Sequence, residues 1–190
     1  MVNAPQPDSL LSSSTTVSRY LAMEKAKNRD GIAKFIRERF HERYIQPFEN
    51  NPKKSGFIMM ASACLMIEAL ESFWNGWRKS PNSALAFCQF FDRENGFSLL
   101  RGHAQEFYAH VRCGIMHQAE TTGGWHIRRD LGELFYSSTK TVDATVFLNE
   151  MDGSLTEYCG RLNTAAWESE EWKKLRKKMK DVCANTQPEV

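Results

Sequence analysis

Residues 107–129 read FYAHVRCGIMHQAETTGGWHIRR, and this stretch carries the features that decide the interpretation of the chain. It begins as the last turns of an amphipathic helix and ends in a Gly-Gly turn followed by a short alternating segment. Arg112 and His117 lie near the expected end of that helix. Arginine and histidine together at a helix end suggest phosphate chemistry, because one binds phosphate and the other transfers protons.

Composition indicates a soluble globular protein, with 42% hydrophobic and 25% charged residues in a chain of 190. The net charge of +2 gives no global case for nucleic-acid binding. The longest apolar run, residues 57–67, is shorter than the roughly 20 residues of a membrane span, and no secretory signal pattern opens the sequence. We therefore expect a cytoplasmic protein without membrane contact.

The five cysteines form no CxxC pair and no cluster with metal-ligand spacing. Reduced thiols that serve as small core residues are the simplest interpretation. Neither a Gly-rich phosphate loop nor an HExxH or GxSxG motif is present in the sequence. We expect no metal and no cofactor.

Hydrophobic periodicity predicts a mainly α fold, a bundle of four to six helices with a small β-hairpin insert after the fourth helix. Residues 1–16 are rich in Pro, Ser and Thr and are predicted to be a flexible tail. Residues 17–185 are predicted to form a single domain. Helices are expected over about residues 17–42 (broken near Asp30-Gly31), 56–79, 81–92, 98–116, 142–162 and 169–183, with the hairpin between residues 125 and 137.

The predicted helix over residues 56–79 is apolar on nearly every side in its first half, which is typical of a central helix. Its second half carries a polar stripe of Glu68, Glu71, Ser72 and Asn75 at helical spacing. Two interpretations are open: the stripe faces water, or Glu68 or Asn75 faces a functional site.

On the predicted helix 98–116, His103, His110 and His117 recur every seven residues and so form one stripe, with Glu106 on the same flank. Neighbouring members lie two turns apart, roughly 10 Å, which is too far for imidazoles to share one metal ion. The stripe therefore favours a solvated face or a groove that faces a partner.

Arg112 and His117 do not share a face of a regular helix, because positions five apart differ by about 140° around the axis. They can act together if the helix loosens at Gly114 and turns His117 around. They can also meet if a second copy of the helix completes the site across a two-fold axis. The remaining alternative is structural, with Arg112 capping carbonyls and His117 hydrogen-bonded in the turn.

The Arg-x4-His spacing of Arg112 and His117, at the end of an amphipathic helix, resembles the HEPN superfamily of helical domains. The likeness extends loosely over about residues 30–165. Ribonucleases of that superfamily carry Arg-x(4–6)-His at the end of a bundle helix and usually work as dimers. The residue after the arginine is often Asn, Asp or His in the superfamily, and here it is Cys113.

The resemblance implies a metal-independent endoribonuclease that works as a homodimer on RNA, in a toxin or defence system with an antitoxin or regulatory partner. His117 would be the general acid and base, and Arg112 would stabilise the charge on the phosphate. Catalytically inactive members also exist, so the alternative is a non-catalytic helical module of the same fold that binds a protein or nucleotide partner. The residues that could support the site are Glu68, Asn75, His110 and Glu120.

Two basic regions are candidates for RNA contact. The first comprises Arg101 and, on the predicted hairpin, His126, Arg128 and Arg129. The second is the last helix, where glutamates precede six basic residues between positions 173 and 180. That order matches the helix dipole, so a solvated helix is the alternative to an RNA-backbone contact.

Overall fold

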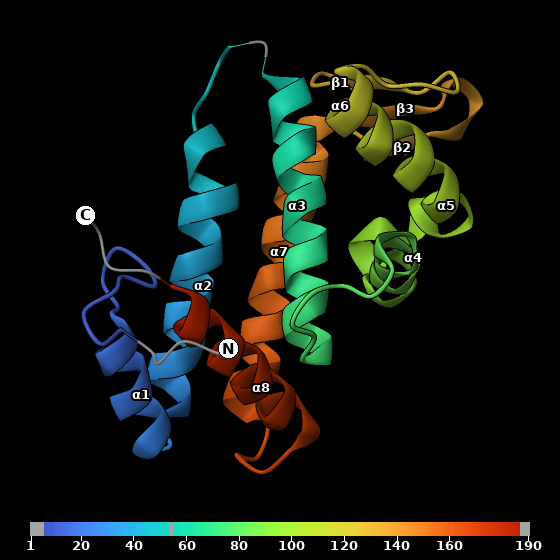
Figure 1. Ribbon diagram of the computed structural model, residues 1–190. Helices are drawn as coiled ribbons and strands as arrows, with labels where there is room; N and C mark the ends of the chain where they lie inside the picture. The colour runs from blue at the N-terminus through green and yellow to red at the C-terminus, as the bar shows by residue number, and fades with distance from the viewer. Residues whose placement is uncertain (1–5, 54, 187–190) are drawn as a thin grey trace. The chain divides into compact units, whose positions relative to one another are not determined.

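The computed structural model describes residues 6–53 and 55–186, and it confirms a mainly helical fold with a small β-insert (Figure 1). The chain divides into two compact units. The first unit comprises Met1–Arg43, Ser72–Lys79 and Leu155–Val190, and the second comprises Tyr44–Glu71 and Ser80–Ser154. Two long helices, α3 (Gly56–Asn75) and α7 (Ala144–Thr164), contribute residues to both units. The prediction of a single domain over residues 17–185 stays a prediction.

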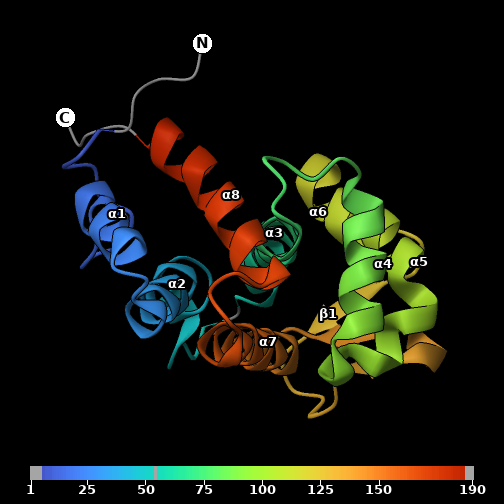
Figure 2. The ribbon, with the colours of Figure 1, turned by 90° about the horizontal axis from the view of Figure 1, so that it is seen from below.

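The first unit contains α1 (Val17–Lys25), most of α2 (Arg29–Tyr44) and α8 (Glu170–Asn185). Figures 1 and 2 show α1 alongside α2, and the rings of Tyr20 and Phe35 join them with centroids 5.8 Å apart. The break predicted near Asp30-Gly31 falls slightly earlier, where Lys27 adopts a positive φ of 52°. The side chains of Thr16 and Ser169 cap the first turns of α1 and α8.

The segment before α1 differs from the flexible tail that composition predicted for residues 1–16. Residues 1–5 lie outside the described residues. From residue 9 onward the chain folds back on itself, because Leu10 pairs with Thr16 in an isolated antiparallel bridge. Leu11 is fully buried, so one apolar side chain in an otherwise polar stretch anchors it.

The second unit contains α4 (Ser83–Arg93) and an irregular helical stretch that packs against it (Figure 2). Phenylalanines form the contact, and Phe107 lies edge-on to Phe91 of α4 with centroids 5.3 Å apart. Other rings of this core are Phe87, Phe90 and Phe97, all with 0% exposure. A short 3₁₀-helix, η1 (Gln46–Phe48), precedes α3.

The predicted regular helix over residues 98–116 is wrong. The stretch consists of the 3₁₀-helix η2 (Asn95–His103), the single turn α5 (Ala104–Glu106), the π-helix η3 (Phe107–Arg112) and α6 (Cys113–Gln118). Tight and wide turns have different numbers of residues per turn, so side chains before and after them lose their helical phase. The predicted alignment of His103, His110 and His117 along one helix face assumed a regular α-helix and is therefore not valid.

The β-insert is a three-stranded mixed sheet rather than a hairpin. Its strands are β1 (His126–Arg128), β2 (Phe135–Tyr136) and β3 (Thr141–Asp143), in the order β1-β3-β2. β3 pairs parallel to β1 and antiparallel to β2, while Ser137–Thr139 form the 3₁₀-helix η4. Buried Asp143 holds the insert together, since its carboxylate accepts backbone N–H bonds from Leu131, Thr145 and Val146.

The helix α3 is long enough, at 20 residues, and apolar enough, with a mean hydropathy of 1.5, to cross a membrane by those two measures. More than half of the window, 56%, is buried within the protein, and the core helix of a soluble protein meets the same criterion. The predicted absence of membrane contact stays a prediction. Glu71 and Ser72 are buried, with exposures of 0% and 5%, so the interpretation that the whole polar stripe faces water is wrong.

Candidate functional site

Arg112 ends the π-helical segment and points at α3 within the second unit. Its Nε donates a hydrogen bond of 2.8 Å to Oε1 of Glu68. The guanidinium also lies over the ring of Tyr108, 5.6 Å from the centroid. The side chains of Arg112 and Glu68 keep 16% and 20% of their surface exposed. The pair is thus held from two sides and still reached by solvent.

Glu68 accepts hydrogen bonds from two side chains, that of Arg112 and that of a serine on α4. Its second oxygen, Oε2, accepts a hydrogen bond of 2.8 Å from the Ser83 hydroxyl in the first turn of α4. Three helical segments, α3, α4 and η3, therefore meet at one carboxylate. The sequence analysis named Glu68 among the residues that could support the site, and its contact with Arg112 is present.

The electrostatics of this cluster favour a charged arginine. Burial lowers the pKa of Arg112, but the hydrogen bond and negative charge of Glu68 outweigh it and raise that pKa further. Burial, followed by a hydrogen bond with Cys113, raises the pKa of Tyr108, so its hydroxyl stays protonated. Beneath the cluster, burial raises the pKa of the Cys64 thiol. The Arg112 guanidinium therefore stays positively charged. Glu68 is its anionic partner, and the Tyr108 and Cys64 side chains near it are uncharged.

His117 lies in the last turn of α6 and is exposed. Its side chain forms no hydrogen bond or ion pair with any residue that the structure describes. The helix ends at Gln118, and the next residue, Ala119, adopts a left-handed φ of 55° and donates its N–H to the Gly114 carbonyl. A Cβ on Gly114 would lie 2.5 Å from the Glu120 carbonyl oxygen, so this glycine permits the tight chain reversal.

Within one chain, Arg112 and His117 are not in direct polar contact among the described residues. The predicted loosening at Gly114 is wrong, because α6 runs as a regular α-helix through it and the π-helical turns precede Arg112. The two residues therefore keep the separation of about 140° expected for positions five apart.

The other histidines of this stretch have structural partners. His110 Nδ1 lies 2.9 Å from the Thr122 hydroxyl, and its ring covers Gly123 in the turn before the sheet. His103 lies edge-on to Phe135, with centroids 5.0 Å apart. Glu106 forms an ion pair with Lys140 at 3.0 Å. These contacts brace the sheet against the helical stretch, and no group of three or more His, Cys, Asp or Glu within residues 6–53 and 55–186 is arranged to hold a metal ion.

Two further supporting candidates have no hydrogen bond to Arg112 among the described residues. Glu120 is exposed, and its carboxylate accepts a hydrogen bond from the N–H of the adjacent Thr121 at 3.0 Å. Asn75 belongs to the first unit, whereas Glu68 belongs to the second. Of the predicted supporting residues, Glu68 alone is hydrogen-bonded to Arg112 within the described part of the chain.

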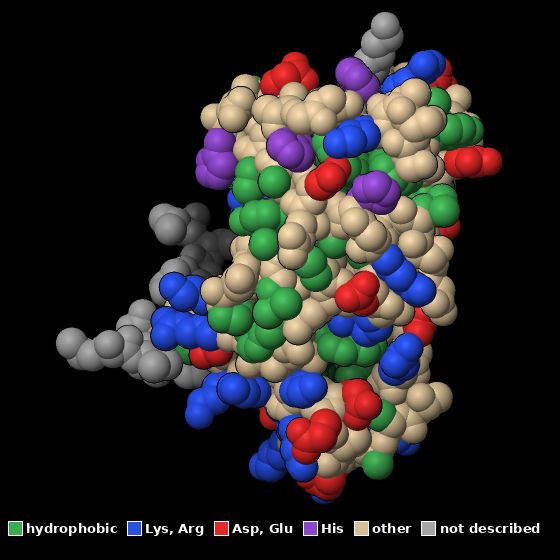
Figure 3. All heavy atoms as spheres, turned by 90° about the vertical axis from the view of Figure 1, so that its right-hand side faces the viewer, with side chains coloured by type: hydrophobic (Ala, Val, Ile, Leu, Met, Phe, Trp, Pro, Cys, Tyr) green, Lys and Arg blue, Asp and Glu red, His purple; other side chains and the backbone are tan. Residues whose placement is uncertain are grey.

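The predicted RNA-contact residues differ in exposure and in the partners that their side chains have within the protein. Arg129 is a brace, since its guanidinium donates to Thr145, Ser55 and backbone carbonyls of the loop before α3. Arg101 donates to the Phe91 carbonyl and to Asn95. Arg128 is exposed and paired with Asp130. His126 is exposed, and Figure 3 shows histidine side chains gathered on the face that it views.

The sequence interpretation missed two residues of the cluster. Tyr108 lies four residues before Arg112, a spacing at which an aromatic ring and a cation meet on a helix, so this contact could have been found. Ser83 carries no such signal, because its contact with Glu68 depends on how α4 packs against α3. No family model, curated protein or solved structure matches the chain.

Proposed function

We propose that the chain is a HEPN-like, metal-independent endoribonuclease of the cytoplasm, in which Arg112 of one copy works with His117 of a second copy. The observation that carries the proposal is the contrast at this site. Arg112 is oriented through Nε by Glu68, whereas His117, five residues later, is exposed and has no partner among the described residues. A role in a toxin or defence system with an antitoxin partner rests on the HEPN resemblance and stays a prediction.

The arginine would bind and stabilise the phosphate. Glu68 accepts from Nε of Arg112, and the guanidinium carries two further nitrogens with N–H donors. A guanidinium fork binds two phosphate oxygens at once, and it does so best when its orientation is fixed in advance. The negative charge of Glu68 weakens the attraction for phosphate, but it also keeps the guanidinium from folding onto other groups.

The histidine would move the protons. In this reaction the 2′-hydroxyl attacks the adjacent phosphorus, a new P–O bond forms, and the bond to the 5′-oxygen breaks. One proton leaves the 2′-oxygen and another reaches the 5′-oxygen. An imidazole can carry out both transfers in turn, and an exposed, partnerless ring such as His117 is free to do so.

Exposed apolar side chains around the Arg112–Glu68 pair supply the surface for a second copy. Leu65 lies one turn before Glu68 on α3 and is 44% exposed, while Met116 lies one turn after Arg112 and is 47% exposed. Ile58, on the same face of α3 as Leu65, is 61% exposed. Exposed apolar residues that gather around a polar centre mark interaction surfaces. A two-fold axis through this patch would present each His117 to the partner copy.

The second candidate is a non-catalytic module that binds a protein or nucleotide partner. One observation favours it: Arg112 already has an anionic partner in its own chain, so its charge is partly neutralised. In that case the same apolar patch of Ile58, Leu65 and Met116 would serve partner binding, and His117 would be dispensable.

The decisive assay is cleavage of labelled single-stranded RNA in EDTA. We expect the wild type to cleave, and His117→Ala and Arg112→Ala to lose at least about 100-fold in rate. Cleavage that survives both substitutions would exclude this site. A folded wild type that cleaves none of several RNAs would favour the binding module.

The dimer surface is tested separately by sedimentation. Leu65→Asp with Met116→Asp should give a monomer and abolish cleavage. Leu99→Asp is the matched control, since Leu99 is 55% exposed on η2 and lies outside the proposed patch. A wild type that stays monomeric at all concentrations and still cleaves would contradict the shared site.

A further inference from the structure

Residues 9–16 of the first unit, here called the serine turn, form a closed loop before α1. The loop is closed by the Leu10–Thr16 bridge and by a hydrogen bond of 2.7 Å from the Leu11 N–H to the Thr15 carbonyl. Leu11 is fully buried beneath the loop, whereas Ser13 and Ser14 at its tip are exposed. The tip is therefore accessible to an enzyme, although its base is anchored in the unit.

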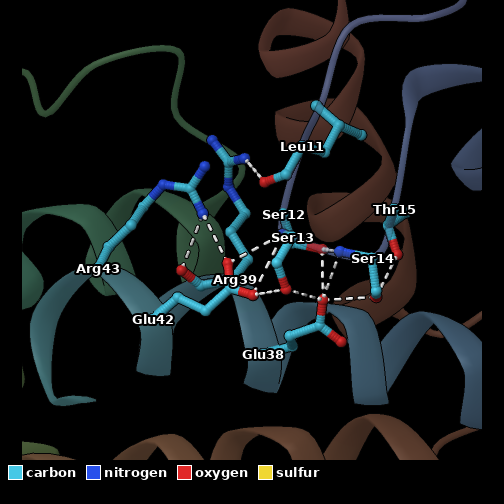
Figure 4. A network of polar contacts seen from close by, with 9 residues as sticks. All are labelled: Leu11, Ser12, Ser13, Ser14, Thr15, Glu38, Arg39, Glu42 and Arg43. Carbon is cyan, nitrogen blue, oxygen red and sulfur yellow. Dashed lines mark hydrogen bonds and ion pairs between the residues drawn. The ribbon is translucent and has the colours of Figure 1, made fainter.

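The tip is fastened to α2 by two carboxylates (Figure 4). Glu38 Oε1 accepts hydrogen bonds from the Ser12 and Ser14 hydroxyls at 2.6 and 2.5 Å, and from the Ser14 N–H at 3.2 Å. Both oxygens of Glu42 lie 3.1 Å from the Ser13 nitrogen, and the Ser13 hydroxyl donates to Oε1 as well. The turn supplies the donors and α2 supplies the negative charge.

The arginines around the turn hold its backbone. Arg39 donates to the Leu11 carbonyl, and Arg19 donates to the Ser14 carbonyl at 2.8 Å. Arg43 lies 4.0 Å from Glu42 and donates to the Arg39 carbonyl at 3.0 Å. Figure 4 shows the serine hydroxyls directed at the glutamates, with the Arg39 guanidinium at Leu11. Negative charge added at a hydroxyl would therefore meet a carboxylate first.

We propose that the serine turn is a latch that a phosphoryl group on Ser13 or Ser14 opens. The serine Oγ would attack the γ-phosphorus of a nucleoside triphosphate bound to a protein kinase, its proton would pass to the base of that kinase, and the nucleoside diphosphate would leave. The phosphate brings a charge of about −1.5 to −2 and removes the hydroxyl donor. Both changes act against the contact with Glu38 and Glu42, so residues 9–16 detach from α2 and expose Leu11.

The direct test places phosphoserine at position 13 of the full chain by genetic code expansion and follows backbone hydrogen exchange. The amides of Leu11 and Val17 report the latch, because each donates to a carbonyl within the loop. We expect phosphoserine to speed their exchange by at least about tenfold, while amides of α8 stay unchanged. Ser13→Ala is the matched control that removes the hydroxyl without adding charge, and its effect should be smaller.

A charge reversal separates repulsion from simple loss of a hydrogen bond. In a Glu42→Lys background, phosphoserine at position 13 should slow the exchange of Leu11 rather than speed it. The proposal is overturned if phosphoserine protects Leu11 in the wild-type background, which would mean that Arg39 or Arg43 captures the phosphate. It is also overturned if phosphoserine and alanine speed exchange equally.

Discussion

The helix α3 carries two glutamates one turn apart, each paired with an arginine, and the pairs differ in how far water reaches the glutamate. The two arginines are similarly exposed, Arg93 at 19% and Arg112 at 16%. Glu71 is completely buried and is held by Arg93, whose Nε also lies 2.8 Å from Glu94. Burial lowers the pKa of Arg93, but both glutamates raise it by a larger amount. Glu68, three residues earlier, keeps 20% of its side chain exposed and shares Arg112 with solvent.

The comparison separates a structural pair from a functional candidate without reference to any motif. A buried pair must be complete, because either partner left alone is an uncompensated charge in the interior. A pair that solvent still reaches can exchange its partner for a ligand at lower cost, since water partly screens both charges. Of the two, the Arg112–Glu68 pair is therefore the one that we propose as the phosphate site.

The largest expected effect is on the buried pair. Arg93→Leu leaves Glu71 and Glu94 without their cation and should lower the free energy of unfolding by about 3 to 5 kcal/mol. Arg112→Leu, the matched change at the partly exposed pair, should cost less, about 1 to 2 kcal/mol, because Glu68 stays in contact with water. Urea unfolding monitored by circular dichroism measures both. Equal losses of unfolding free energy in the two variants would contradict the difference between the buried and the partly exposed pair.

The next largest effect is a loss of RNA cleavage in His117→Ala without a loss of stability. His117→Ala should lower RNA cleavage by at least about 100-fold, because the proton carrier is lost. It should change the free energy of unfolding by less than about 0.5 kcal/mol, because the side chain is exposed. Cleavage rates and urea unfolding of the same preparation give both numbers. A strongly destabilised His117→Ala would point to a structural role instead.

Glu68→Gln removes the negative charge of the side chain and keeps its size and shape. The amide oxygen can still accept from Arg112 and the amide NH2 can donate to the Ser83 hydroxyl, yet the side chain no longer fixes the guanidinium by ion pairing. We expect cleavage to fall by about tenfold, less than for Arg112→Ala, because the phosphate-binding group remains. Ser83→Ala, which removes one contact to Glu68 and no charge, is the control and should have a smaller effect. An increase in RNA affinity in Glu68→Gln would show that Glu68 competes with the phosphate.

The smallest effect comes from Cys64, which lies one turn before Glu68 and is buried. Burial raises the pKa of its thiol, so the folded state keeps the proton while the unfolded state releases it above its ordinary pKa of about 8.5. Stability that Cys64 provides is thus present at neutral pH and declines as the pH rises past that value. Between pH 8 and 9.5 the stability advantage of wild type over Cys64→Ala should shrink by about 1 kcal/mol. A constant difference would mean that water reaches the floor of the site.

Much of the helical layout follows from periodicity, and the exceptions have physical causes. The α1–α2 break, α3, α4 and α8 were predicted within a few residues, because apolar spacing and capping residues mark them. The π-helical turns before Arg112 carry no such mark, since they arise where aromatic residues such as Phe107 pack against α4. Likewise, Leu11 anchors a stretch whose polar composition predicted flexibility.

The candidate site was predictable in its residues and not in its contacts. Arg112, His117 and Glu68 were named from residue type and spacing. Whether Arg112 meets Glu68 or His117 depends on how three helical segments pack, which a linear pattern does not encode. Glu71 lies one helical turn after Glu68 and is completely buried, whereas Glu68 is partly exposed. Sequence spacing alone does not distinguish the burial of these two carboxylates.

Complementation between inactive variants tests the shared site most directly. Arg112→Ala and His117→Ala are mixed, unfolded and refolded together, and assayed on RNA in EDTA. If each site takes Arg112 from one copy and His117 from the other, half of the dimers regain one intact site, and the mixture recovers about a quarter of wild-type activity. Sites built within a single chain would leave the mixture as inactive as either variant alone, and that result would contradict the account.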